Sequence, residues 1–388
     1  MPTTMHLDSL RRPSPLQTVW QSVWPLLVGI GLALVLHFAL PKVVNGYRVR
    51  IAMDIGMAMI FAVSLNIVNG MTGQFSIGHA GFMALGGYTA GLITYYVSLT
   101  AWHSTARHGG FLGVGEWLFF FSCIVGGLVA AGLGYLVGLP SLRLRGDYLA
   151  IVTLGFGEIL RVLLQQTNPV IDDYSELQSA TAAQLFPPPV GGALGFNGIP
   201  KYTSIFWVYT WLAITVIAAW RLKNSSLGRA MISIREDEIA ARAMGVNVTR
   251  QKVWAFILAA FFAGCGGGLF AHEFGLNIEP RDAGFQRSFD YIIMVVLGGS
   301  GSITGSMISA AILTWLPEAL RDFQKYRLIA YAALLVGMML IRPQGLLGFR
   351  EIWEIWPLSK FFGRKGLANE SVERDGRTEG SRGMRRLP

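Results

Sequence analysis

Long stretches of the 388-residue chain contain no charged residue. Because a helix needs about 20 mostly apolar residues to cross about 30 Å of hydrocarbon, each such stretch can supply a membrane span. Six of them lack Asp, Glu, Lys and Arg altogether: residues 13–41, 55–106, 117–142, 202–220, 253–272 and 291–317. Two shorter apolar stretches are residues 148–166, which include Glu158 and Arg161, and residues 328–341. The pattern predicts an all-α polytopic integral membrane protein.

The last uncharged stretch, residues 291–317, differs from the others in its middle, which reads "LGGSGSITG". Each glycine inside a helix costs about 1 kcal/mol relative to alanine. We therefore expect two short half-helices or a re-entrant hairpin, which is possible where protein or a water-lined cavity covers the backbone. Since residues 55–106 are long enough for two spans, we expect eight spans plus this hairpin, or ten transmembrane helices in all.

The composition supports the membrane assignment and suggests an orientation. Hydrophobic residues make up 52% of the chain and charged residues 14%, which excludes an ordinary water-soluble globule. An even number of spans places 21 of the 32 lysines and arginines on one face, although Lys42, Arg48 and Arg50 fall on the other. By the positive-inside rule the basic face is cytoplasmic, and both termini lie there. This topology explains the net charge of +9, so no nucleic-acid partner is expected.

We expect one transmembrane domain over residues 23–349, a cytoplasmic N-terminal segment over 1–22 and a charged, largely disordered cytoplasmic tail over 350–388. Residues 167–201 form an outer loop rich in Pro and Gly, and residues 223–252 form a large cytoplasmic loop. The sequence contains no phosphate-binding loop, no zinc-protease motif and no C-x-x-C pair. We therefore expect no catalytic residue, no metal and no cofactor bound by this chain, which is not an enzyme.

The cytoplasmic loop contains "SIREDEIAARAMGVNVTRQK", residues 233–252. Ser233 and Glu236 have the spacing of a capping box, and Gly245 is a typical helix stop, so a short helix is predicted between them. Its apolar stripe consists of Ile239, Ala240, Ala243 and Met244. A helix this short is unstable alone in water, so the stripe must be covered by a partner or, alternatively, by the membrane domain or the lipid surface.

Several blocks of the sequence resemble a known family. In chain order they read "LNIVNGMTGQFSIGHAGFMALGGY", "LRLRGDYLAIVTLGFGEILR", "EIAARAMG" followed by "VWAFILAAFFAGCGGGLFA", "IMVVLGGSGSITG" and "LLVGMMLIRPQGLLG". Together they cover most of residues 50–348 and resemble the permeases of ABC importers for branched-chain amino acids. The loop departs from the general importer motif, in which Glu directly precedes the paired alanines. Here Ile239 precedes Ala240 and Ala241, and Glu238 stands one position earlier.

The resemblance implies a transmembrane permease subunit in the bacterial inner membrane that imports leucine, isoleucine and valine. The partners it implies are two ABC ATPase subunits, which hydrolyse ATP, a second related permease chain, an extracytoplasmic solute-binding protein and membrane lipid. It also assigns the cytoplasmic helix to ATPase coupling, through Glu238, Ile239, Ala240, Ala241, Ala243, Met244 and Gly245. Urea, short amides and aromatic acids are alternative substrates within the class.

Glycines also interrupt the stretch "NGMTGQFSIGHAGFMALGGYTAG", residues 69–91. Glycine lets helices approach closely in lipid, and a glycine-broken segment exposes backbone groups that can line a solute path. Together with the break inside residues 291–317, this segment gives the expected path residues, which are Asn69, Gln74, Ser76, Gly78, His79, Gly81, Gly299 and Gly301. The alternative is that the glycines only pack helices and that a neighbouring carbonyl satisfies His79.

Two charge pairs have helical spacing within or beside the spans. Arg50 and Asp54 stand at i, i+4, and Glu158 and Arg161 stand at i, i+3, so we expect each pair to form an ion pair. A secondary transporter driven by an ion gradient would need ionisable residues near mid-membrane and an inverted repeat. The central spans here are nearly uncharged. An ABC permease is therefore favoured over a secondary transporter, and a passive channel is a weaker third alternative.

Overall fold

The computed structural model describes residues 15–141, 147–273, 275 and 277–321, together with isolated positions between 326 and 352. The chain divides into two compact units between residues 349 and 350, and every element considered below belongs to the first. Of the two expected terminal segments, residues 1–14 and 353–388 lie outside the described residues.

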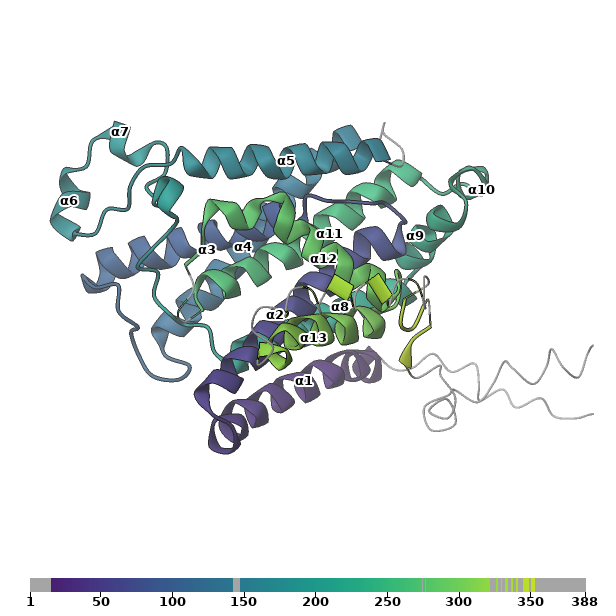
Figure 1. Cartoon of the computed structure of the whole chain (residues 1–388), viewed down its shortest axis with the longest axis horizontal. Helices are drawn as coiled ribbons and strands as arrows, with labels where there is room; N and C mark the ends of the chain where they lie inside the picture. The colour runs from purple at the N-terminus through teal and green to yellow at the C-terminus, as the bar shows by residue number, and fades with distance from the viewer. Residues whose placement is uncertain are drawn as a thin grey trace, which may run out of the picture. The chain divides into compact units, whose positions relative to one another are not determined.

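Helices make up the ordered secondary structure, and in the described ranges the only extended pairings are two isolated bridges (Figure 1). The elements are α1 (Pro15–Val43), α2 (Gly46–Asn66), the π-helix η2 (Ile67–Met71), α3 (His79–Trp102), α4 (Val114–Ser141), α5 (Asp147–Gln165), α6 (Tyr174–Ser179), α7 (Ala182–Leu185), the 3-10 helix η3 (Gly192–Leu194), α8 (Ile205–Asn224), α9 (Ser226–Glu236), α10 (Glu238–Ala243), α11 (Val248–Ala271), the 3-10 helix η4 (Pro280–Ala283), α12 (Phe285–Gly298) and α13 (Ile303–Ala319). The all-α prediction is confirmed for this part of the chain.

The long helices run side by side between two ends that Figure 1 distinguishes. Helices α6 and α7 lie at one end, here called the α6 end, and α9 and α10 lie at the other, here called the α10 end. The predicted outer loop, residues 167–201, contains α6 and α7, and the predicted cytoplasmic loop, residues 223–252, contains α9 and α10. The two loops therefore lie at opposite ends of the helices.

Six helices of the described chain are long and apolar enough to cross a membrane: Val23–Val43, Gly46–Met71, Val114–Leu139, Tyr148–Gln165, Ile205–Asn224 and Val248–Ala271. The 24-residue helix α3 is not among them, although it carries no charge, because Gly, Thr and Tyr reduce its hydropathy. It lies in the interior, where Ala80, Met83 and Ala84 are fully buried. Helices α12 and α13 are shorter, at 14 and 17 residues. The interpretation of residues 291–317 as two short helices is thus confirmed.

Glycine sets the distance between the central helices. A Cβ built on Gly86 of α3 would lie 2.3 Å from Cα of Gly264 on α11, and one on Gly264 would lie 2.9 Å from the Gly126 carbonyl oxygen on α4. Real Cβ contacts are never this short, so these backbones touch only because no side chain separates them. Close approach through small residues is a common way for helices to associate in lipid. Gly86 therefore packs helices together, which is the alternative role given above for the glycines of residues 69–91.

The first break in the helices follows α2, at the α10 end. The π-helix η2 is followed by the non-helical residues 72–78, whose amides have lost their intrahelical partners. Polar side chains replace these partners. Asn69 Oδ1 accepts from Ser76 N at 3.2 Å, and Thr153 Oγ1 of α5 accepts from Ile77 N at 3.0 Å. The backbone is therefore non-helical here without being left unpaired.

The second break is the turn between α12 and α13. Gly299 and Gly301 have φ values of +106° and +99°, which side chains with a Cβ rarely adopt. The Asn66 side chain at the end of α2 binds this turn twice: Oδ1 accepts from Gly301 N at 2.8 Å, and Nδ2 donates to Ser302 O at 3.1 Å. Lys223 Nζ of α8 donates to Gly301 O at 2.8 Å. The two breaks thus meet through Asn66.

Glycine packing can be tested with a matched pair of variants. A Cβ on Gly267 of α11 would lie 1.9 Å from the Met83 carbonyl oxygen, whereas one on Gly132 of α4 has no neighbour within 4 Å. Gly267→Leu should destabilise the protein by about 3 kcal/mol or more, because a backbone atom cannot move aside. Gly132→Leu should keep the wild-type stability. The measurement is the folded fraction recovered by size exclusion after heating in detergent, and equal recovery of the two variants would contradict this account of the interface.

Candidate functional site

Helix α10 is a short helix with a defined start and stop. Asp237 is its N-cap, and Asp237 Oδ1 accepts from Ile239 N at 2.8 Å and from Ala240 N at 3.0 Å. Gly245, at φ +84°, ends it: Gly245 N donates to Arg242 O and Val246 N donates to Ala241 O, both at 3.0 Å. This is a Schellman motif, so the predicted glycine stop is confirmed.

The predicted start of this helix was wrong. Ser233 lies inside α9, where its hydroxyl donates to Ala230 O at 2.8 Å. The chain turns sharply at Asp237, which has φ −155° and ψ +112°, and α10 begins after it. Ser233 and Asp237 are both good capping residues by type. The cap of α10 is Asp237 because α9 continues through Ser233, and this continuation buries Met231 and Ile234.

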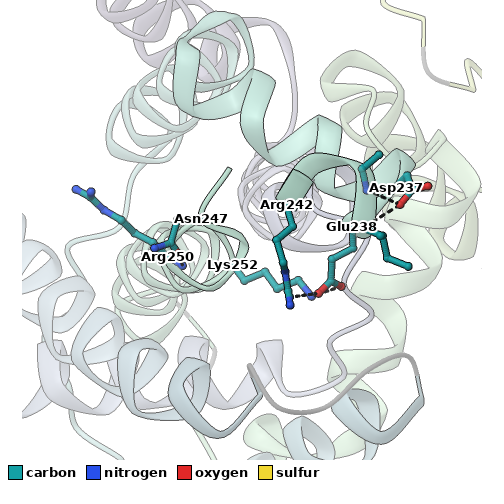
Figure 2. A network of polar contacts seen from close by, with 8 residues as sticks. Asp237, Glu238, Arg242, Asn247, Arg250 and Lys252 are labelled. Carbon is teal, nitrogen blue, oxygen red and sulfur yellow. Dashed lines mark hydrogen bonds and ion pairs between the residues drawn. The ribbon is translucent and has the colours of Figure 1, made fainter. Parts of the chain in front are cut away.

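Charged and apolar contacts attach α10 to the helix that follows it. Figure 2 shows Arg242 and Lys252 reaching the same carboxylate, that of Glu238, from two different helices. Glu238 Oε1 lies 3.1 Å from Arg242 Nη2, and Oε2 lies 2.8 Å from Lys252 Nζ. Lys252 belongs to α11 and is only 7% exposed, so this ion pair is well shielded from water. On the apolar side Ala241 packs in a small buried cluster with Ile234 and Val248.

The remaining predicted residues of α10 lie on its outer surface. Ile239 is 74% exposed and Met244 85% exposed, and Ala240 and Ala243 are exposed beside them. No residue in the described part of the chain covers this stripe. Of the seven predicted coupling residues, Glu238 and Ala241 face the protein, Gly245 ends the helix, and the other four form an apolar outward surface. Such a surface on a rigid support suits a partner protein.

The predicted path residues fall into two groups. Asn69, Gln74 and Ser76 are buried at the α10 end, and each keeps a polar atom without a hydrogen-bond partner: Nδ2, Nε2 and Oγ respectively. Buried polar groups are normally paired, so unpaired ones in this segment suit contact with water or a polar solute. His79 is also buried, and its Nε2 lies 2.9 Å from Ser64 Oγ. These four side chains belong to one short segment.

The four predicted glycines have packing roles in the structure. A Cβ on Gly78 would lie 2.3 Å from the Thr153 carbonyl oxygen, and one on Gly81 would lie 3.2 Å from Leu160 Cδ1, so both pack against α5. Gly299 and Gly301 form the positive-φ turn between α12 and α13. The side chain that binds this turn from the end of α2 is Asn66, a residue that the sequence pattern did not single out.

One of the two expected ion pairs is present. Glu158 and Arg161 pair at 2.5 Å, as predicted. The expected Arg50–Asp54 pair was wrong: Arg50 Nε lies 3.8 Å from Oε1 of Glu273, which follows α11 more than two hundred positions away in the sequence. The i, i+4 spacing allows Arg50 to reach Asp54. In the tertiary structure, however, the side chain of Arg50 lies closer to the carboxylate of Glu273.

Comparison with known proteins identifies the family. Residues 47–342 match the model for the permease component of branched-chain amino acid transport systems. The chain belongs to this family. It is 36% identical over 330 residues to the high-affinity branched-chain amino acid permease proteins LivM of Salmonella typhimurium and of Escherichia coli K12, covering 81% of this chain and 73% of each relative. It is 24% identical over 304 residues to LivH of Salmonella typhimurium, covering 76% of this chain and 92% of the relative. No solved structure matches the chain.

This permease connects α9 directly to the first helix break. Arg235, two residues before the α10 cap, donates from Nη1 to Gly70 O in η2 at 2.9 Å. A Cβ on Gly70 would lie 1.9 Å from Asn66 Oδ1 and 2.4 Å from Gly301 N, so Gly70 also touches the second break. The sequence analysis missed Arg235 and Asn66. An asparagine inside an uncharged span was the only available signal for Asn66, and Arg235 stands among other charges.

The Arg235 contact predicts a local change in stability. Arg235→Gln should remove the charged hydrogen bond to Gly70, a loss of about 1.5–3 kcal/mol, so amides in residues 70–78 should exchange with deuterium roughly tenfold faster or more. Arg242→Gln is the matched control, because Arg242 binds Glu238 and not the break. Hydrogen exchange with mass spectrometry measures both. If Arg242→Gln increased the exchange rate of amides in residues 70–78 as much as Arg235→Gln does, the Arg235–Gly70 contact would have no specific role.

Proposed function

We propose that this chain is the permease subunit of an ABC importer that carries leucine, isoleucine and valine across the inner membrane. The identity of 36% to two LivM proteins over most of the chain carries this proposal. LivM and LivH of one organism, Salmonella typhimurium, both resemble the chain, which supports pairing with a second related permease. Two ATPase subunits hydrolyse ATP, an extracytoplasmic solute-binding protein delivers the amino acid, and this chain binds no cofactor.

In this proposal the α10 end faces the cytoplasm and α10 is the coupling helix. Its outward stripe of Ile239, Ala240, Ala243 and Met244 inserts into an ATPase subunit. Movement of that subunit displaces α10 as a rigid unit, because both its ends are capped and Glu238 binds Lys252. The displacement reaches α11 through Lys252 and the first helix break through Arg235. Coupling of this kind requires a contact whose free energy differs between two conformations.

The solute path in this proposal passes the two helix breaks. Asn69, Gln74, Ser76 and His79 contribute polar groups near the α10 end, and the glycines Gly78, Gly81, Gly299 and Gly301 shape the backbone around them. Three unpaired buried polar atoms in this segment support that role. The breaks are also where the coupling helix is attached, so ATP-driven movement acts on the part of the path nearest the cytoplasm.

The orientation makes a separate prediction. In this proposal helices α3, α12 and α13 also cross the membrane beside the six apolar helices. The apolar stretch of residues 328–341 is the predicted tenth span, and an even number of spans places both termini in the cytoplasm. Reporter fusions after residue 12 and after residue 350 should then both give the cytoplasmic signal, and a fusion after residue 175 should give the external one. Signals from opposite sides for the first two fusions would reject this topology.

The coupling role predicts the effect of a charge on the stripe. Ala240→Asp and Ala243→Asp would bury an unpaired carboxylate in the ATPase contact, which costs about 3–5 kcal/mol. We expect the ATPase subunits to be lost on purification and leucine uptake to fall by more than about tenfold, while the permease still inserts. Co-purification and uptake of radiolabelled leucine measure these effects.

Thr249→Asp is the control for these variants. Thr249 is exposed in the same loop but lies off the stripe, at the start of α11, where a negative charge suits the helix N-terminus. It should retain ATPase binding and uptake. Wild-type behaviour of both alanine variants would instead favour a stripe that lies on the lipid surface.

A further inference from the structure

A cavity of about 470 Å³ lies between α2, α12 and α13, beside the end of α11. Pockets that enclose small organic ligands usually have about 300–1,000 Å³, so an amino acid fits inside with accompanying water. Neither the predicted path residues nor the coupling helix lines it. The cavity is therefore a second site in the permease, distinct from the helix breaks.

Charged side chains line the α6 end of this cavity. They are Arg50 and Asp54 in the first turns of α2, Arg287 and Asp290 in the first turns of α12, and Glu318 in the last turn of α13. Both signs of charge are present within one wall. Ionisable residues inside a membrane protein are costly, and they mark substrate and ion pathways when they face a cavity.

Arg287 is oriented in a way that leaves it able to bind a carboxylate. Its Nε lies 3.3 Å from Asp282 Oδ1, and its guanidinium carbon lies 5.7 Å from the centre of the Phe270 ring. These contacts hold the side chain in place. Within the described chain its two terminal nitrogens make no hydrogen bond, and a guanidinium presents these nitrogens to a carboxylate in parallel.

Two carboxylates that line the cavity form no ion pair at salt-bridge distance among the described residues. Within the described residues neither Asp54 nor Asp290 has a lysine, arginine or histidine nitrogen within 4.0 Å, because Arg50 lies toward Glu273 and Arg287 toward Asp282. A carboxylate in a cavity without a cation in direct contact suits an incoming ammonium group. The cavity wall therefore has carboxylates that can bind a cation, beside a guanidinium that can bind an anion.

Apolar side chains line the other end of the cavity. Met57, Ala58 and Phe61 lie along α2 beyond Asp54, and Met294 and Leu313 lie opposite on α12 and α13. The Phe61 and Tyr291 rings close this end, with centroids 4.8 Å apart. Beyond them lies His79, whose ring centre is 6.3 Å from that of Tyr291. The cavity therefore has a charged end, an apolar end and an aromatic floor in front of the helix break.

We infer that this cavity binds a free zwitterionic α-amino acid with an aliphatic side chain before it passes to the helix breaks. The ammonium group lies against Asp54 and Asp290, the carboxylate against Arg287, and the side chain against Met57, Phe61 and Leu313. The inference rests on the proposed function for the direction of transport. It adds a recognition site in the membrane subunit itself, which selects the zwitterion independently of any solute-binding protein.

Cysteine protection tests this site without a binding protein. Thr314 lines the cavity, and a cysteine there differs little in size. The native Cys123 and Cys265 are buried and should react little with a thiol reagent. In the purified permease complex, leucine at about ten times its Kd should slow labelling of Thr314→Cys about tenfold, because the unoccupied fraction falls to about a tenth. Ser175→Cys, in the exposed loop, should label at the same rate with or without leucine.

Two further comparisons test the chemistry of recognition. Isocaproate lacks the ammonium group of leucine and isoamylamine lacks the carboxylate, so neither should protect Thr314→Cys at the same concentration. Adding Asp54→Asn to Thr314→Cys should abolish protection by leucine, whereas adding Glu158→Gln should not, because Glu158 pairs with Arg161 away from the cavity.

The outcomes separate this inference from the proposed function. If the complete wild-type importer takes up leucine but leucine does not slow Thr314→Cys labelling, the cavity is not the site and the proposed function stands. Equal protection by isoamylamine would likewise overturn the zwitterion assignment. If the wild-type importer does not take up leucine, the proposed substrate is wrong, and the cavity inference falls with it.

Discussion

The amide of Asn66 is the contact on which the arrangement at the α10 end depends. A membrane protein must satisfy every backbone group internally, and this chain breaks its helices twice. Asn66 ends α2 just before the first break and binds both the amide of Gly301 and the carbonyl of Ser302 in the second. Arg235 and Lys223 then bind carbonyls of the two breaks from the adjoining helices. Breaks separated by more than two hundred residues are thus one structural unit, which a movement of α9 would disturb as a whole.

The permease combines this polar unit with a closely packed interior and a firmly held surface helix. Glycine contacts among α3, α4 and α11 leave little freedom for sliding. Helix α10 contributes only one buried residue, yet capping at both ends and the Glu238–Lys252 pair fix its position on α11. A short helix held in this way transmits displacement without unfolding. Its outward apolar stripe is not covered by any of the described residues.

Charged residues of both signs gather at one end of a cavity. Glu158 and Arg161 neutralise each other on α5, whereas Asp54 and Asp290 face a space large enough for a solute. A zwitterion brings both charges with it, so a site with carboxylates and a guanidinium can bind it without a net change of charge. The aromatic pair of Phe61 and Tyr291 then separates this cavity from the buried His79.

The sequence by itself determined the features that depend on local chemistry. Uncharged stretches of sufficient length specify membrane helices, Gly245 specifies a helix stop through its positive φ, and the i, i+3 spacing of Glu158 and Arg161 specifies their pair. The tertiary structure alone decided the choices between equivalent local options. It selected Asp237 over Ser233 as the cap, Glu273 over Asp54 as the neighbour of Arg50, and Asn66 as the residue that joins the two breaks. Each of these contacts depends on helices far apart in sequence, and neither spacing nor residue type encodes which distant group will lie within hydrogen-bonding distance.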